Sequence, residues 1–344
     1  MQMRGILLYS RLLVYILAAV MLSVACGSRE AEEGRRFVNE VVIKTTPVKE
    51  QGRSPLCWAY AMLATIESER LMQGDSVNLS PDYLARMWLQ EQARACYLSQ
   101  GRAVVSMRGM MPMTTRLMER YGIEPYDNYR SFDSVNWDVL ARTARQVARA
   151  SVSLDMLDRR LGDVLDRQLG FLPPNLFMLG MAYTPRQFAE SVCLPADYLF
   201  LTSFTHHPFG SSFVLELADN RMFDQYLNVP VDTMMNAIVK TLRSGHPVCW
   251  EGDISEDGFD FKKGVAVLAD DGKPVTQQRR QRAFERFETT DDHCMELCGL
   301  AHDGQGRRFF IAKNSWGKGN RFQGFMYLSY NYVKMKTIAV ALPR

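Results

Sequence analysis

The stretch that most constrains this chain runs from Pro47 to Tyr60, where a loop leads directly into a helix that begins at a cysteine. Gly52–Pro55 favour a loop, and from Cys57 apolar residues recur at helical spacing as far as Gly74. A thiol in the first turn of a helix lies at the positive end of the backbone dipole, which favours the nucleophilic thiolate. An inert cysteine on a core helix is the alternative interpretation of this stretch alone.

Two further stretches, near the other end of the chain, offer partners for this cysteine. Asp292-His293-Cys294-Met295 follows a polar loop and starts an alternating strand, and Lys313-Asn314-Ser315-Trp316-Gly317 follows a second predicted strand. Together the three stretches resemble the papain-like cysteine peptidases, and most closely their bleomycin hydrolase (aminopeptidase C) branch. The resemblance covers about residues 40–342.

A cysteine hydrolase needs a thiolate, a base, a group that orients the base, and donors for the oxyanion. Cys57 is the candidate nucleophile and His293 the candidate base, and Asn314 can accept the ring N–H and hold the tautomer that faces sulfur. The resemblance implies that Trp316 shields this hydrogen bond from water. It also implies that Gln51, six residues before Cys57, is the oxyanion glutamine, acting with the backbone N–H of Cys57.

A metal site is the rival interpretation of the region after His293, because Cys294, Cys298 and His302 follow one another at four-residue steps. On a helix these side chains would be neighbours, but on the predicted strand Cys294 and Cys298 are about 13 Å apart. We therefore expect no metal and no other cofactor. The remaining histidines lack a nearby cysteine or asparagine pattern and receive no role: His206, His207 and His246.

A helical first half followed by a half of strands predicts an α+β chain. Helices are expected from Cys57 to about Gln73, from Ser80-Pro81 onward, up to Tyr121, and through residues 135–195 with a break at Pro173-Pro174. Strands are expected from about Tyr198. The resemblance implies a two-lobed papain-like domain over residues 37–344, with a helical N-terminal lobe at about 51–195 and an antiparallel β lobe at about 198–344. Residues 135–195 match the helical insertion of the bleomycin hydrolase branch.

Residues 1–25 have the order of an export signal, in which a basic start precedes a short apolar run and small residues. Leu22-Ser23-Val24-Ala25-Cys26 resembles a bacterial lipoprotein processing site and predicts lipidation of Cys26, although Ser23 departs from the usual aliphatic residue. An ordinary secretory signal cleaved near Ala25 is the alternative. Residues 26–36 are expected to be a charged tether, and the protein is expected at the bacterial cell envelope, attached to the membrane through Cys26.

Net charge gives no indication of a nucleic-acid partner, because the formal charge of +3 falls to +1 once Arg4 and Arg11 are removed with the signal. Arg279, Arg280 and Arg282 form a basic cluster that we expect in a surface loop or helix.

Pro55-Leu56 departs from the family, which usually places glycine and a small residue before the nucleophile. Pro55 removes a backbone N–H, but the oxyanion donor belongs to Cys57, and Leu56 is expected to add bulk at the mouth of the site. The expected function is hydrolysis of peptide substrates through a Cys-His-Asn site, aminopeptidase- or oligopeptidase-like. The alternative is a catalytically inactive, peptide-binding lipoprotein on the same fold.

Enzymes of the bleomycin hydrolase branch are held to exopeptidase action by a C-terminal arm that lies in the cleft. This chain has an apolar stretch at Ile338–Leu342 and then Pro343-Arg344. If that stretch is a sheet strand, two residues extend at most about 7 Å, which is too short to reach Cys57. We therefore expect that a free amino terminus is not strictly required of substrates.

Overall fold

The computed structural model describes residues 36–131, 135–178 and 180–344. The predicted signal, Cys26 and nearly all of the predicted tether lie outside the described residues. Residues 39–301 and 308–344 form one compact unit, which contains every residue of the site discussed below.

Three helices begin or end where the sequence predicts. They are α2 (Cys57–Met72), α3 (Pro81–Leu98) and α4 (Pro112–Tyr121). At the start of α3, Ser80 Oγ accepts a hydrogen bond from Tyr83 N–H at 3.0 Å, and proline fills the first helical position. α4 ends at Gly122, whose φ is +88° and where an added Cβ would lie 2.2 Å from the backbone of Pro185. Only glycine fits this helix end.

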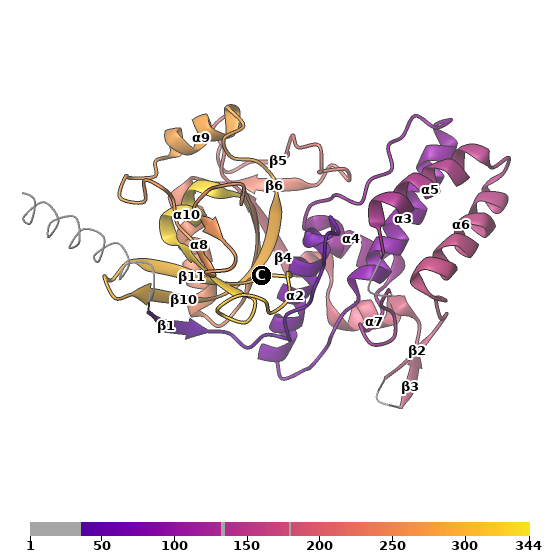
Figure 1. Cartoon of the computed structure of the whole chain (residues 1–344), viewed down its shortest axis with the longest axis horizontal. Coiled ribbons are helices and arrows are strands. Elements are labelled where there is room, and N and C mark those ends of the chain that lie inside the picture. The colour runs from indigo at the N-terminus through magenta and orange to yellow at the C-terminus, as the bar shows by residue number, and fades with distance from the viewer. Residues whose placement is uncertain (1–35, 132–134, 179) are drawn as a thin grey trace, which may run out of the picture. The chain divides into compact units, whose positions relative to one another are not determined.

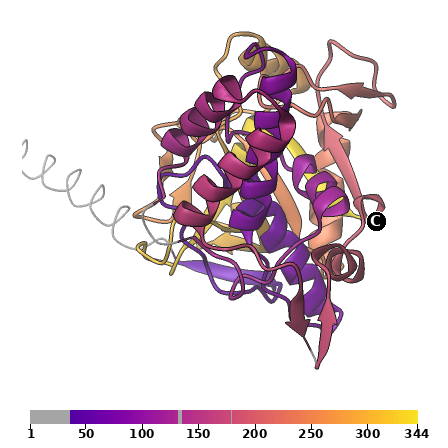
Figure 2. The ribbon, with the colours of Figure 1, turned by 90° about the vertical axis from the view of Figure 1, so that its right-hand side faces the viewer.

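The predicted helical insertion contains α5 (Trp137–Ala150) and α6 (Leu154–Leu169), which lie beside α3 (Figures 1 and 2). α6 buries a leucine on every turn and leaves its charged residues outward. The prediction of continued helix as far as residue 195 was wrong in one part. After the Pro173-Pro174 break the chain forms a small hairpin, β2 (Leu176–Met178) and β3 (Met181–Tyr183), before α7 (Pro185–Val192) and a 3-10 turn, η1 (Pro195–Asp197). Prolines cannot donate backbone hydrogen bonds, so the helix does not resume there.

Strands dominate the second half. They are β4 (Tyr198–Thr202), β5 (Ser212–Val214), β6 (Gln225–Asn228), β7 (Val248–Gly252), β8 (Phe259–Asp260), β9 (Val265–Ala266), β10 (His293–Asp303), β11 (Arg308–Lys313), β12 (Phe325–Ser329) and β13 (Thr337–Pro343). β1 (Phe37–Val42) precedes the helices, and α8 (Val231–Arg243), α9 (Gln277–Glu285) and α10 (Tyr330–Lys336) interrupt the strands.

These strands join in one sheet in the order β5-β6-β4-β13-β7-β10-β11-β12-β9-β8. The β4–β6 and β9–β12 pairs are parallel, and the others in the central part are antiparallel, as predicted. The expected strand at 213–217 is shorter than predicted, since β5 ends at Val214. The α+β prediction is confirmed.

Helix α2 lies between the helices α3, α5 and α6 and the strands of the sheet (Figure 1). It is buried on nearly all sides, from Trp58 to Ser68. Because this helix is enclosed, its first residue, Cys57, is fixed relative to both α4 and β7, against which α2 packs.

The basic cluster lies in a helix, α9, in which Arg282 is exposed as predicted, but Arg280 is not the surface residue that the sequence predicts. Arg280 in α9 is fully buried, and its guanidinium donates to the backbone oxygens of Ser203 and Met335, each at 3.1 Å. Burial lowers the pKa of Arg280 to about 9. Arg279 pairs with Asp270 at 2.6 Å. Arg280 therefore joins α9 to the residue that follows β4 and to α10, and it is not available to a partner.

Within the described residues, no helix has the length and apolar character that a membrane crossing requires.

Candidate active site

Cys57 is the first residue of α2 and is partly exposed in a cavity of about 320 Å³. Leu56 precedes it and provides no side-chain cap, so the amide groups of the first helical turn are not bonded by a capping residue. The sequence-predicted residues Gln51, His293 and Trp316 line the same cavity. Segments more than 200 positions apart in the sequence therefore meet at this thiol.

His293 is the first residue of β10 and is buried beside Asn314, which directly follows β11. Its Nε2 lies 2.8 Å from Asn314 Oδ1. The backbone N–H of Ser315 donates to the same oxygen at 2.7 Å, which identifies that atom of Asn314 as the carbonyl oxygen. Nε2 therefore carries a proton, and Nδ1 is the atom left to accept a proton from sulfur.

Trp316 covers the imidazole. Its ring centroid lies 4.7 Å from that of His293, and Phe259 and Phe261 pack edge-on against the indole. This aromatic cover is consistent with the shielding that the resemblance implies for Trp316.

Two neighbours of the Cys57 sulfur lower the pKa of its thiol well below the usual range. The larger effect is a hydrogen bond from the Cys294 thiol, and His293 adds a hydrogen bond and a favourable charge interaction. Burial opposes both but does not outweigh them. This environment favours the thiolate, which is the reactive form of a cysteine.

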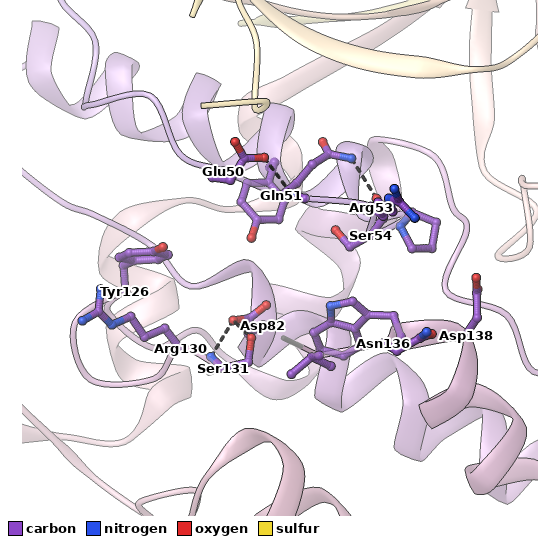
Figure 3. Close-up of a pocket in the computed structure, with 15 residues that line it drawn as sticks. Glu50, Gln51, Arg53, Ser54, Asp82, Tyr126, Arg130, Ser131, Asn136 and Asp138 are labelled. Carbon is purple, nitrogen blue, oxygen red and sulfur yellow. Dashed lines mark hydrogen bonds between the residues drawn. The ribbon is translucent and has the colours of Figure 1, made fainter. Parts of the chain in front are cut away.

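Gln51 lies in the loop before α2 and is fixed at both ends of its side-chain amide. Nε2 donates to the backbone oxygen of Ser54 at 2.8 Å, and Oε1 accepts from Ser315 Oγ at 2.5 Å (Figure 3 shows the bond to Ser54). An amide nitrogen has two N–H donors, of which Ser54 uses one. The other is the one that an oxyanion beside Cys57 would use.

A larger cavity, of about 720 Å³, lies against the same loop but contains neither Cys57 nor His293 in its lining (Figure 3). Two of its polar side chains bind each other, since Asp82 accepts from the N–H and the hydroxyl of Ser131 at 2.7 Å each. The smaller cavity is the candidate active site because it has the nucleophile.

Leu56 does not add bulk at the mouth of the site, contrary to the sequence prediction. The side chain is fully buried and packs in the core with α2. Its apolar surface gains more from that burial than from facing the cavity. Pro55 lines the cavity instead.

Sequence reasoning missed three residues of this site: Cys294, Glu251 and Asp291. The contact between Cys294 and Cys57 depends on the strand register that pairs Cys294 with Glu251. A signal for Glu251 was present, because a glutamate directly after the apolar run Val248–Trp250 is unusual for a core strand.

The region after His293 does not gather metal ligands around the predicted cysteines, since Cys294 contacts Cys57 and Cys298 Sγ points to Ile311 O. The structure does bring together His206, His207 and Glu216, for which we predicted no role. Gln281 Nε2 lies 3.1 Å from His206 Nδ1, so a neutral His206 ring carries its proton on Nε2, the nitrogen that faces Glu216 at 3.3 Å. That arrangement is an ordinary hydrogen-bonded cluster.

The chain is similar to several known proteins. A family model described as the Peptidase C1-like family matches residues 177–343. Aminopeptidase W of Lactobacillus delbrueckii subsp. lactis is 24% identical over 277 residues, which are 69% of this chain and 62% of that protein. The chain thus spans less than two thirds of the length of this curated relative.

The crystal structure of PepW from Lactobacillus rhamnosis superposes with a TM-score of 0.72 at 19% identity, covering 93% of this chain and 84% of that one. Over residues 177–343 this chain is similar to the Peptidase C1-like family. Its fold is papain-like and α+β, and the relatives are in the aminopeptidase-related branch.

Proposed function

We propose that this protein hydrolyses peptide bonds, with Cys57 as nucleophile and His293 as the base that later acts as acid. The observation that supports this best is the 2.8 Å contact between His293 Nε2 and Asn314 Oδ1 beside a cysteine whose thiol pKa is well below its usual range. Asn314 orients the imidazole, and Trp316 excludes water from their hydrogen bond.

The mechanism follows from these positions. The Cys57 thiolate attacks the carbonyl carbon of the substrate, and the carbonyl oxygen becomes an oxyanion that accepts from Gln51 Nε2 and the Cys57 backbone N–H. His293 protonates the leaving amine, and the acyl group stays on sulfur as a thioester. Water then attacks the thioester after giving a proton to His293, which releases the acid and restores the thiolate.

The substrates are peptides, and the action is aminopeptidase- or oligopeptidase-like, an inference supported by the similarity to a protein named aminopeptidase W. The place of action is the bacterial cell envelope, through a lipid on Cys26. This part rests on the sequence of residues 1–36 alone, most directly on the small residues that precede Cys26. The departure at Pro55-Leu56 that suggested an inactive peptide binder loses weight, because Leu56 lies in the core.

The test is hydrolysis of a mixed peptide library by the wild-type protein and by Cys57→Ala. Cys193→Ala serves as the matched control, because this thiol lies outside the cavity and its pKa is raised to about 12 by burial. We expect product release by the wild type and the control, and none by Cys57→Ala. Undiminished turnover by Cys57→Ala would end the proposal.

A further inference from the structure

Acidic side chains line the cavity that holds Cys57. Four carboxylates and two guanidinium groups are exposed to it: Asp219, Glu251, Asp291 and Asp292, with Arg53 and Arg108. Arg108 is bound to two residues of the cavity wall. Its Nε donates to Asp219 Oδ2 at 2.6 Å, and its Nη2 donates to the backbone oxygen of Asp291 at 3.1 Å. Of the three carboxylates that Arg108 does not bind, Asp292 accepts a hydrogen bond from Thr290 Oγ1 at 3.0 Å, which leaves Glu251 and Asp291.

Glu251 and Asp291 contact each other, and each has an oxygen that lacks a donor. Glu251 is fully buried, and its Oε2 accepts a long hydrogen bond of 3.4 Å from the N–H of Met111. Glu251 Oε1 and Asp291 Oδ2 are enclosed and accept from no N–H or O–H group of another described residue, so the hydrogen bond between the two carboxyl groups depends on a proton that they share. A buried carboxylate without donors is costly, and such an atom in a cavity is suited to a ligand that brings donors.

The pair lies beside the reacting thiol. Glu251 in β7 is the register partner of Cys294 in β10, so their side chains lie on the same face of the sheet. The Cys294 thiol contacts Cys57, and Asp291 is two residues before His293. A substrate residue next to the scissile bond must pass close to both carboxylates.

We propose that Glu251 and Asp291 form a subsite for a positively charged group of the substrate, either its N-terminal ammonium or a lysine or arginine side chain near the scissile bond. This inference rests on the proposed peptidase function and specifies its substrates. An ammonium or guanidinium group supplies N–H donors to the two oxygens and neutralises the buried charge.

The protonation of Glu251 and Asp291 follows from the groups around them. Burial raises the pKa of Glu251 well above its usual range, and contact with Asp291 adds to the effect. Burial raises the pKa of Asp291 to about 7. The other titratable groups that act on the pair are Asp219, Arg108, Cys57, Cys249, Cys294 and Tyr226. Glu251 and Asp291 therefore hold a proton that a bound cation replaces. Because Asp291 gains a further proton as the pH falls below about 7, the preference for cationic substrates should weaken there.

The first experiment compares peptides that share one scissile bond. Lysine is replaced by norleucine at each of the two residues before that bond, and every peptide is made with a free and an acetylated amino terminus. We expect kcat/KM to fall about tenfold or more for one of these changes. In the Glu251→Gln, Asp291→Asn double variant, the ratio of kcat/KM between the original and the changed peptide should be close to one. Asp257→Asn is the control, because it removes an exposed negative charge outside the cavity and should keep the ratio.

A loss on acetylation identifies the terminal ammonium as the bound group, and a loss with norleucine identifies the side chain. A wild-type ratio near one for both changes, or an equal ratio in the wild type and the double variant, would overturn the subsite.

A second experiment separates this inference from the peptidase proposal, because it needs no turnover. Cys57 is labelled with 2-aminoethyl or with ethyl methanethiosulfonate, and the labelling rates are measured by mass spectrometry. We expect the ratio of the aminoethyl labelling rate to the ethyl labelling rate to fall by about fivefold or more in the double variant and to stay unchanged in Asp257→Asn. Peptidase activity with the same ratio of labelling rates in the wild type and the double variant would overturn the subsite alone. A lowered ratio in the double variant, without any peptide hydrolysis by the wild type, would overturn the proposed function but not the cation binding.

Discussion

At the scale of single residues, the site depends on which nitrogen of His293 faces sulfur. Asn314 fixes this by accepting the Nε2 proton, and Trp316 covers the contact. Cys294 adds a hydrogen bond to the Cys57 sulfur that no family motif predicts. The thiolate therefore has support from two neighbours, so the loss of ring orientation should not abolish it.

For this reason Asn314→Ala should retain part of the activity. We expect kcat to fall by about 10- to 100-fold with little change in KM, since the ring can still reach sulfur in a less well-held orientation. The measurement is steady-state kinetics on one good substrate, with the thermal unfolding midpoint of each variant recorded alongside. A loss as complete as that of Cys57→Ala, with a lowered midpoint, would show that Asn314 is structural.

At residue scale, the sequence predicted the residues that follow from the chemistry of a cysteine hydrolase and from the family resemblance. Five of them lie on one cavity or at its border: Cys57, His293, Asn314, Gln51 and Trp316. It could not predict Glu251 and Asp291, because their proximity follows from the β7–β10 register and the loop before His293. It misplaced Leu56 and Arg280, since exposure at a loop end or on a charged helix is decided by tertiary packing.

At the scale of elements, a buried charge network connects α2 to the segment that carries Gln51. Glu67 in α2 is fully buried and accepts from the N–H of Leu79 at 2.7 Å, from Lys49 Nζ at 2.5 Å and from Thr46 Oγ1. Lys49 also donates to Leu79 O at 3.0 Å. Since Lys49 is two residues before Gln51, this network sets the distance between the loop that carries Gln51 and Cys57.

Glu67→Ala should therefore destabilise the fold by about 3–5 kcal/mol, because it leaves the buried Lys49 ammonium and the Leu79 N–H unpaired. Replacing both partners, as in Lys49→Met with Glu67→Leu, should cost clearly less. Urea unfolding of the three proteins measures the difference. A cost below about 1 kcal/mol for Glu67→Ala would mean that the network does not hold α2.

Elements with explicit end signals were predicted well from sequence. Ser80-Pro81, Thr184-Pro185 and Gly122 mark helix ends that the structure confirms. The β2–β3 hairpin and the short β5 were missed or misjudged because three-residue strands carry almost no periodic pattern.

At the scale of the whole molecule, the described residues carry the peptidase-like unit and the preceding segment carries the proposed anchor. A charged stretch at residues 27–36 separates Cys26 from the first strand. A lipid on Cys26 would thus keep the unit at a membrane surface.

Cys26→Ser should block processing or release the protein from the membrane fraction. The measurement is fractionation followed by mass spectrometry of the mature amino terminus, with Cys193→Ala as a control that should still partition with membranes. A wild-type protein that is found in the soluble fraction and starts at a residue other than Cys26 would rule out the anchor.

The central claim is that Cys57 is an activated nucleophile, and the pH dependence of its alkylation tests this most directly. An ordinary thiol has a pKa near 8.5, so its alkylation slows about tenfold for each pH unit below that value. Because the pKa of Cys57 is lowered, the thiolate persists at mildly acidic pH and the slowing should begin only at much lower pH. Cys249 and Cys294, whose thiol pKa values burial raises, should stay unlabelled and serve as internal controls.

We therefore predict that iodoacetamide labels Cys57 at about pH 6 nearly as fast as at about pH 8, as followed by peptide mass spectrometry. A rate that falls about a hundredfold between those two pH values would show an ordinary thiol and contradict the account.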